Sequence, residues 1–188
     1  MCSGCVVHLK EFTIKLDVQG LKRHDIMKVA EIMYRRRALL KKVLIISDTH
    51  GLLRDEVKAK LPTVDFVIHA GDINTPMVLQ YLNEHSELFI IRGNNDKEWA
   101  CNLPKILVIT IEGVRILLVH NKEDIPKELT NIDVVIYGHS HKYDDKIVDG
   151  VLWLNPGSCG KHRFDLPISM CEMWISGGVY KYEKIIIE

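Results

Sequence analysis

Five short polar segments of this sequence carry side chains that can bind a metal ion. They combine carboxylate, amide and imidazole groups: Asp48-Thr49-His50, Gly71-Asp72, Gly93-Asn94, His120 and Gly138-His139-Ser140-His141. Mixed imidazole and oxygen ligands suit Mn²⁺, Fe²⁺, Zn²⁺ or Ni²⁺ better than Ca²⁺, which takes oxygen ligands. The segments therefore predict a site for a divalent transition metal, in which one carboxylate such as that of Asp72 can bridge two ions.

Each segment taken alone is a weak signal. An Asp-x-His pair is more often a helix cap or a surface pair, and a His-x-His pair is commonly accidental. All five segments, however, follow apolar runs with the character of strands, with at most two residues in between. Core packing has no use for ionisable side chains at five strand ends, so the set as a whole indicates a function.

The elements that must position these residues alternate between strand and helix in the first half of the domain. Three apolar runs have the composition of buried strands: 43–46, 66–68 and 88–91. Helices fit between them at 53–61 and 76–84, where Thr75 is a suitable N-cap and Pro76 can take the first helical position. This order predicts parallel strands joined by right-handed crossovers, with a ligand site beyond their carboxyl ends.

The second half of the domain changes to hairpins. Several of its apolar runs are separated by short turns, and the runs are 106–111, 115–119, 134–137, 146–148, 151–154 and a final hairpin around 176–178. Short connections such as Asp149-Gly150 join antiparallel neighbours. We therefore predict an α/β fold, a two-sheet sandwich flanked by helices (αββα), with mixed parallel and antiparallel strands and the metal site at the carboxyl ends of the strands.

The length and composition fit a globular chain of 188 residues, with 47% hydrophobic and 27% charged residues. No apolar stretch exceeds four residues, whereas a membrane-spanning helix needs about 20. The N-terminus lacks the basic and apolar blocks of a secretory signal, and the five cysteines follow no regular spacing. We expect a cytoplasmic protein with no membrane contact and no disulfide framework.

The beginning of the chain differs from the rest in charge. Residues 1–42 hold ten Lys/Arg against four Asp/Glu, whereas residues 43–188 hold fifteen against twenty-one. We interpret residues 1–41 as an N-terminal extension, partly helical or flexible, and residues 42–188 as the domain that carries the function.

Within the extension, an amphipathic helix is expected from Asp25 onward, because apolar residues recur at helical spacing there. The run Arg35-Arg36-Arg37 that follows is either an anion-binding arm or, as charge runs usually are, the solvated face of a helix. Translation could also begin at Met27 or Met33.

The order of the five segments, followed by Asn155-Pro156-Gly157-Ser158, resembles the calcineurin-like metallophosphoesterases. The resemblance runs from residue 42 to the C-terminus and is greatest to their small phosphodiesterase branch, which is related to the retromer subunit of the same fold. It implies two divalent transition-metal ions, with Mn²⁺ as the first choice and Ni²⁺, Fe²⁺ or Zn²⁺ as alternatives. By this resemblance one ion would be held by Asp48, His50, Asp72 and His141, and the other by Asp72, Asn94, His120 and His139.

The same resemblance implies a metal-dependent phosphoesterase, in first place a phosphodiesterase, in which a hydroxide bound by both metals attacks the phosphorus atom. Its catalytic residues would be Asp72, Asn94, Asp96 and His120, with Asp96 orienting a histidine. A serine or cysteine nucleophile is then not needed. The expected partner is a small phosphate-ester substrate.

Two positions depart from the family pattern. Relatives that act on monoesters often have histidine after the ligand asparagine, and Asn95 stands there instead. An amide cannot deliver a proton to a leaving group, so diesters or esters with good leaving groups become better candidates. Asn121 follows His120 where the family usually has glycine, which can change a local backbone contact. Arg163 could contact a substrate phosphate, although a surface arginine is the simpler interpretation.

The main alternative is a non-catalytic metal-binding module for protein interaction, since the retromer relative uses this fold in that way. The complete ligand set favours the enzyme, because an unfilled cluster of carboxylates repels itself. A nuclease is less favoured, since residues 43–188 are acidic and lack a basic stripe. The sequence leaves open the substrate, the metal used in the cell and any homo-oligomer.

Overall fold

The computed structural model describes residues 6–9, 12–15, 24, 28, 40–163 and 165–187. The chain forms two compact units, residues 1–39 and 40–188. In the first unit, β1 (Val6–Leu9) and β2 (Phe12–Lys15) pair antiparallel. His24 and Lys28 have helical backbone. The remainder of the helix expected from Asp25, and the run 35–37, lie outside the described residues.

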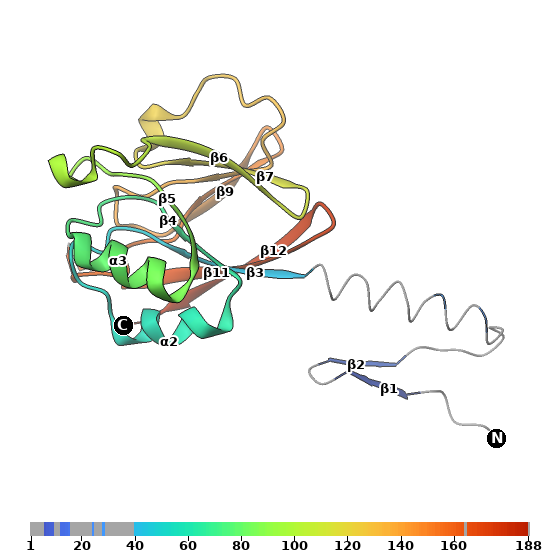
Figure 1. Cartoon of the computed structure of the whole chain (residues 1–188). Coiled ribbons are helices and arrows are strands. Elements are labelled where there is room, and N and C mark those ends of the chain that lie inside the picture. Colours follow the sequence, from blue (N-terminus) through green and yellow to red (C-terminus); the bar gives the residue numbers. More distant parts are fainter. Residues whose placement is uncertain are drawn as a thin grey trace. The chain divides into compact units, whose positions relative to one another are not determined.

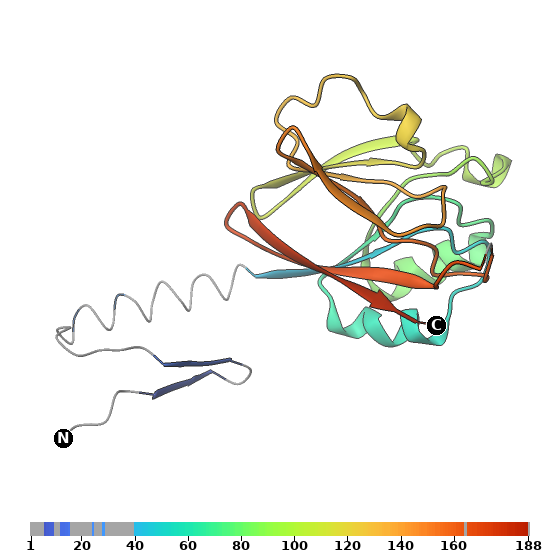
Figure 2. The same ribbon diagram turned by 180° about the vertical axis from the view of Figure 1, so that it is seen from behind.

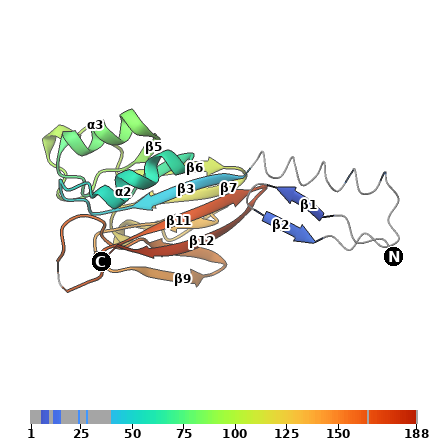
Figure 3. The ribbon, with the colours of Figure 1, turned by 90° about the horizontal axis from the view of Figure 1, so that it is seen from below.

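The first sheet of the second unit has the strand order β12-β11-β3-β4-β5 (Figure 1). Three of its strands run parallel: β3 (Lys41–Ile46), β4 (Phe66–His69) and β5 (Glu87–Ile90). Two more are added antiparallel: β11 (Ser169–Ser176) and β12 (Val179–Ile186). The connecting helices α2 (Asp55–Lys60) and α3 (Pro76–His85) lie on the same outer face of this sheet (Figure 3).

The second sheet has the strand order β6-β7-β8-β10-β9. Its strands are β6 (Ile106–Ile111), β7 (Val114–Val119), β8 (Val134–Ile136), β9 (Asp144–Val148) and β10 (Val151–Asn155). β8 pairs parallel with β7 and β10, and the other pairings are antiparallel. The segment 121–133 crosses the outer face of this sheet (Figure 2), where Ile125, Leu129 and Ile132 pack on the buried side chain of Val119 and its neighbours.

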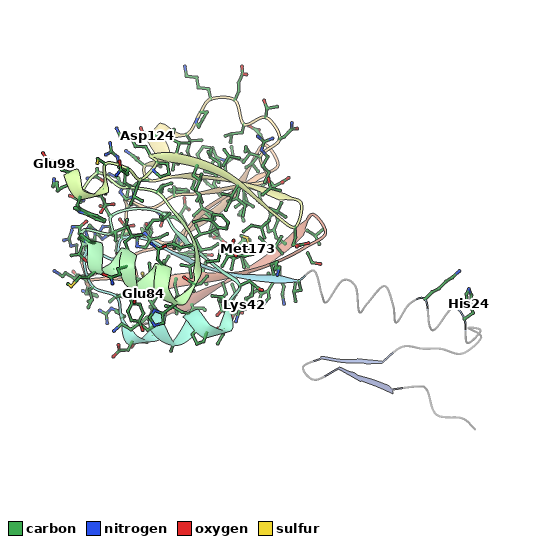
Figure 4. All side chains as sticks on the ribbon, viewed as in Figure 1. His24, Lys42, Glu84, Glu98, Asp124 and Met173 are labelled. Carbon is green, nitrogen blue, oxygen red and sulfur yellow. The ribbon has the colours of Figure 1, made fainter. Side chains whose placement is uncertain are left out.

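The main core lies between the two sheets, because successive strand residues point to opposite faces. In β3, Val43 and Ile45 face the second sheet, whereas Leu44 and Ile46 face the helices. Met173 of β11 belongs to the core between the sheets (Figure 4). Both faces of β3 are therefore buried, and this explains its uninterrupted apolar run.

The predicted two-sheet α/β sandwich is confirmed, with one difference in its outer layers. Both α-helices of the second unit cover the first sheet, and the segment 121–133 covers the second. Thr75 caps α3 as predicted, since its Oγ1 accepts a hydrogen bond from the Val78 amide at 3.4 Å. Among the described helices, none is long and apolar enough to span a membrane.

Candidate metal centre

The loops that follow β3 and β4 continue to pair after the strands end. The amides of Asp48, His50 and Gly51 donate hydrogen bonds to the carbonyls of Gly71, Asp72 and Ile73, at 3.0, 2.9 and 2.8 Å. This pairing places the Asp48 and His50 side chains beside that of Asp72.

Most of the predicted ligands have a left-handed backbone conformation. The φ angles are 53° at Asp48, 47° at His50, 58° at Asp72, 70° at His139 and 58° at His141. Asp and His tolerate this region better than most residues, yet it is uncommon in any L-residue. Such conformations cluster at functional sites, where the surrounding structure enforces them.

Asp48, His50 and His141 bring three ligand atoms together at one end of the cluster. The Nε2 atoms of His50 and His141 are 3.0 Å apart, and Asp48 Oδ1 lies 3.5 Å from His141 Nε2 and 3.9 Å from His50 Nε2. Asp72 Oδ2 is 3.8 Å from His50 Nε2. These residues form a group that could hold a metal ion.

The other end of the cluster is built around His120. Its Nε2 lies 3.4 Å from Asp72 Oδ1 and 3.0 Å from Asn94 Oδ1, and Asn94 Oδ1 is 2.9 Å from His139 Nδ1. On its far side, His120 Nδ1 lies 2.8 Å from the Ala70 carbonyl oxygen and donates to it. This hydrogen bond turns Nε2 toward the cluster, as in metal-binding histidines.

All seven predicted ligands therefore meet at one place. They differ in their exposure to solvent. Asp48, His50, Asp72, His120 and His141 are buried. Asn94 and His139 are exposed. Among these seven side chains, the exposed ones are those of Asn94 and His139, so the described part of the site is open on their side.

The two carboxylates of the site differ in their proton affinity. Burial raises the pKa of Asp48 to about 7, and the negative charge of Asp72 adds to this rise. Burial also disfavours ionised Asp72, but hydrogen bonds from His120 and Asn95 hold the pKa of Asp72 well below its usual range. Two neighbouring buried carboxylates thus repel each other when both are ionised. A bound cation would offset this repulsion.

The histidines also differ. Burial lowers the pKa of His141 to about 4, with the positive charges of His50 and Arg163 acting in the same direction. Burial and the charge of Arg163 likewise lower the pKa of His50. Both rings are then neutral at pH 7 and offer a lone pair. Burial opposes a charge on His120, but the Asp72 hydrogen bond and the charge of Asp48 raise its pKa.

Two glycines of the motifs are needed because the loops approach so closely. A Cβ at Gly71, whose φ is 94°, would lie 2.7 Å from His120 Nδ1. A Cβ at Gly93 would collide with Asp72 Oδ1. Any side chain at these positions would displace a predicted ligand.

Asp96 has a different environment from the one expected. Its carboxylate accepts hydrogen bonds from the amides of Gly93, at 2.8 Å, and Asn74, at 2.7 Å. No histidine hydrogen-bonds to it among the described residues. Asp96 therefore ties the Asn94 loop to the loop after Asp72 and does not orient an imidazole.

Asn95 contacts the central carboxylate directly. Its amide nitrogens donate to both Asp72 oxygens, at 2.8 Å from the backbone and 2.6 Å from the side chain. Asn95, which stands where relatives often have histidine, thus donates its side-chain hydrogen bond to Asp72.

The residues that position the loops lie far from them in the sequence. Ser158 Oγ donates to the Asp48 carbonyl at 2.9 Å, and Asn155 Nδ2 donates to the Gly138 carbonyl at 2.8 Å. The Asn-Pro-Gly-Ser segment thus joins the loops of Asp48 and His139. His69 is fully buried, and its Nε2 lies 3.0 Å from Thr49 Oγ1.

The described cysteines near the core are unsuited to nucleophilic catalysis. Cys159 and Cys171 are buried, and burial raises the pKa of each thiol to about 12. A thiolate is therefore not available at neutral pH.

With the fold and the cluster defined, comparison with known proteins gives the family. The calcineurin-like phosphoesterase superfamily domain matches residues 42–178. The chain belongs to this superfamily, whose fold binds divalent metals.

Relatives of known name support this assignment. A phosphodiesterase of Methanocaldococcus jannaschii is 30% identical over 147 residues, which cover 67% of this chain and 89% of the relative. A probable metallophosphoesterase of Bacillus subtilis is 33% identical over 129 residues, which cover 62% of this chain and 73% of the relative.

Solved structures share the fold at lower identity. Vacuolar protein sorting 29 of Cryptosporidium parvum has a TM-score of 0.65 at 19% identity, covering 79% of this chain and 98% of that protein. A phosphoesterase of E. coli has a TM-score of 0.59 at 22% identity, covering 78% of this chain and all 100% of its own.

Proposed function

We propose that this protein is a metal-dependent phosphodiesterase that uses two divalent transition-metal ions, Mn²⁺ in first place. The observation that carries the proposal is the convergence of seven ligand-type side chains, from the ends of five strands, on one half-open site. One metal would be held by Asp48, His50, Asp72 and His141, and the other by Asp72, Asn94, His120 and His139.

The donor atoms fit such a pair of ions. Asp48 Oδ1 is buried and receives no hydrogen bond from any described residue. The Asn94 oxygen faces His120 Nε2 and His139 Nδ1 at hydrogen-bond distance. Since His120 Nδ1 donates to Ala70, a neutral His120 would present a lone pair to this oxygen. Either an extra proton or a metal ion is then required between them.

Bound divalent ions would supply positive charge for the phosphate oxygens and lower the pKa of a water molecule. The chain's own groups prepare the place for this chemistry. Asn95 and His120 keep Asp72 ionised at the centre of the site. Asp96 fixes the backbone around Asn94, and the exposed Asn94 and His139 leave room for the ester.

The preference for diesters has two supports. The Asn95 side chain donates to Asp72 and, as an amide, cannot protonate a departing alkoxide. A relative that is 30% identical is a phosphodiesterase. The substrate is accordingly a small phosphate ester whose leaving group departs without strong acid assistance.

The test is hydrolysis of bis-p-nitrophenyl phosphate and p-nitrophenyl phosphate by metal-stripped protein that is resupplied with Mn²⁺ or Ni²⁺. We expect metal-dependent cleavage with a preference for the diester. Asp72→Ala and His120→Ala should each lower kcat/KM by at least about 100-fold, because each removes a charge or ligand worth several kcal/mol.

Matched controls are Asp55→Ala and His85→Ala, which remove an exposed aspartate and an exposed histidine of the helices. Both should retain full activity. Absence of turnover with every metal, despite metal binding measured by calorimetry, would contradict the proposal and favour a non-catalytic metal-binding module.

A further inference from the structure

A small cavity opens beside the metal centre on its exposed side. Its volume is about 160 Å³, and its walls include Asn94, His120, Asn121 and His139 together with Arg92 and Lys105. Pockets for whole drug-sized ligands are usually about 300–1,000 Å³. This cavity therefore suits one substituent of a substrate whose phosphate lies at the metal centre.

Two positive charges line this cavity without partners. The side chains of Arg92 and Lys105 form no ion pair or hydrogen bond with any residue in the described part of the chain. Other lysines of the domain do form such pairs, for example Lys41 with Asp65 and Lys42 with Glu172.

The backbone brings these two cations to the same wall. The Arg92 amide donates a hydrogen bond to the carbonyl of Pro104, the residue before Lys105, at 2.9 Å. Asp124 also lines the cavity, so the three side chains leave a net positive charge there. Residues 43–188 as a whole are acidic, so the positive charge of this cavity wall is opposite in sign to the net charge of the domain.

We propose that Arg92 and Lys105 bind a second anionic group of the substrate, a carboxylate or phosphate-type group on the part of the ester that stays attached to the phosphorus. The inference rests on the proposed function. Asn94, His120 and His139 belong both to the metal centre and to the cavity wall, so a phosphate at the metals directs one substituent toward the two cations. A guanidinium matches the geometry of such an anion.

The test uses three diesters with the same p-nitrophenolate leaving group and the same metal-loaded enzyme. They are p-nitrophenyl phenyl phosphate and its derivatives with a 4-carboxyl or a 4-phosphono group on the phenyl ring. For whichever charged derivative is preferred, we expect kcat/KM to be about tenfold higher than for the uncharged phenyl diester. Two partly exposed charge contacts that each raise kcat/KM roughly threefold would give this ratio. The ratio should fall as salt is added, and the two derivatives distinguish a carboxylate from a phosphate-type group.

The double variant Arg92→Gln/Lys105→Gln should bring this ratio close to one, and Arg92→Lys should keep part of it. If the double variant does not fold, Lys105→Gln alone replaces it. The matched control is Lys122→Gln/Lys142→Gln, which neutralises two lysines of the neighbouring cavity of about 260 Å³ and should leave the ratio unchanged. Calorimetric binding of diphenyl phosphate and its 4-carboxyl derivative, which lack a good leaving group, gives a second readout.

Equal kcat/KM for all three diesters in the unmodified protein would overturn the inference and leave the proposed function intact. A charge preference that survives the double variant would also overturn it. Absence of hydrolysis for all three would refute the proposed function, and the inference with it.

Discussion

Replacement of His69 should release two loops of the metal centre at once. His69 Nδ1 accepts a hydrogen bond from the Gly71 amide at 3.2 Å, so Nε2 carries the proton and donates to Thr49 Oγ1 at 3.0 Å. Thr49 lies between the ligands Asp48 and His50, and Gly71 precedes Asp72. The imidazole is thus a brace between the first two ligand segments, although it contacts none of the ligands.

His69→Phe keeps the bulk of the side chain but leaves two buried polar groups without their partner. Each such group costs about 1–3 kcal/mol, so the free energy of unfolding should fall by about 2–6 kcal/mol. The cost lies toward the lower end, because Thr49 Oγ1 also lies 3.4 Å from the Ile73 carbonyl oxygen. His69→Asn should lose less, since its Oδ1 can still accept from Gly71.

The pH dependence of the free energy of unfolding distinguishes the contribution of His69 from other effects of its replacement. Burial lowers its pKa to about 3 in the folded protein, whereas an unfolded imidazole has a pKa of about 6.5. The neutral ring therefore stabilises the fold above pH 6.5, and this contribution is lost as pH falls toward 3. Between pH 7 and pH 5, linkage gives a loss of about 2 kcal/mol from this residue.

The assay is urea unfolding of the metal-free protein at pH 7 and pH 5. The unmodified protein should lose about 2 kcal/mol more between these pH values than His69→Asn, because other titrating groups are common to both. An equal loss in the two proteins would refute the assignment of His69 as a buried neutral brace.

Two further predictions concern the loop around Asn94. Gly93→Ala should lower phosphodiesterase activity by about 100-fold or more while the circular dichroism spectrum is retained, because the new Cβ would collide with Asp72 Oδ1. At Gly150 an added Cβ would meet nothing within 4 Å, although its φ of 83° makes any side chain strained. Gly150→Ala should therefore lower stability somewhat and leave activity unchanged, and equal losses of activity in both variants would contradict the prediction. Asp96→Asn should lower the free energy of unfolding by about 1–3 kcal/mol, since its side-chain amide has one acceptor oxygen for two backbone amide donors. Thermal unfolding of the metal-free protein measures this change. An unchanged midpoint would contradict the prediction.

The strands of this domain and the residues that meet at its candidate site could be predicted because both follow local rules. The strands β3, β4 and β5 end at Ile46, His69 and Ile90, within one residue of the ends of the apolar runs 43–46, 66–68 and 88–91. Parallel strands present their carboxyl ends at one edge of a sheet. The strand order is therefore enough to predict that the polar residues just beyond these ends lie close together. The helix boundary was less certain, because Leu53 and Leu61 flank α2 as buried residues without belonging to it.

The braces of the site could not be predicted in the same way. The hydrogen bond from Ser158 to Asp48 joins residues 110 positions apart, and neither residue type nor spacing indicates the pairing. The hydrogen-bond partners of Asp96 could not be predicted for the same reason. A carboxylate beside a ligand can orient either an imidazole or a backbone loop, and only the tertiary structure decides that its partners are the amides of Gly93 and Asn74.

The division of the site into a buried side and an exposed side is the property that is hardest to predict from the sequence. His139 and His141 are two positions apart on one loop, yet His141 is buried and His139 is exposed. The two residues also differ in their neighbours, because the Ser158 amide donates a hydrogen bond to the His141 carbonyl at 3.3 Å. In the proposed function, the buried residues would act on a substrate only through the metals that they would hold, whereas the exposed residues could also contact the ester. We therefore expect substrate specificity to depend on the residues around Asn94 and His139, which include Arg92 and Lys105.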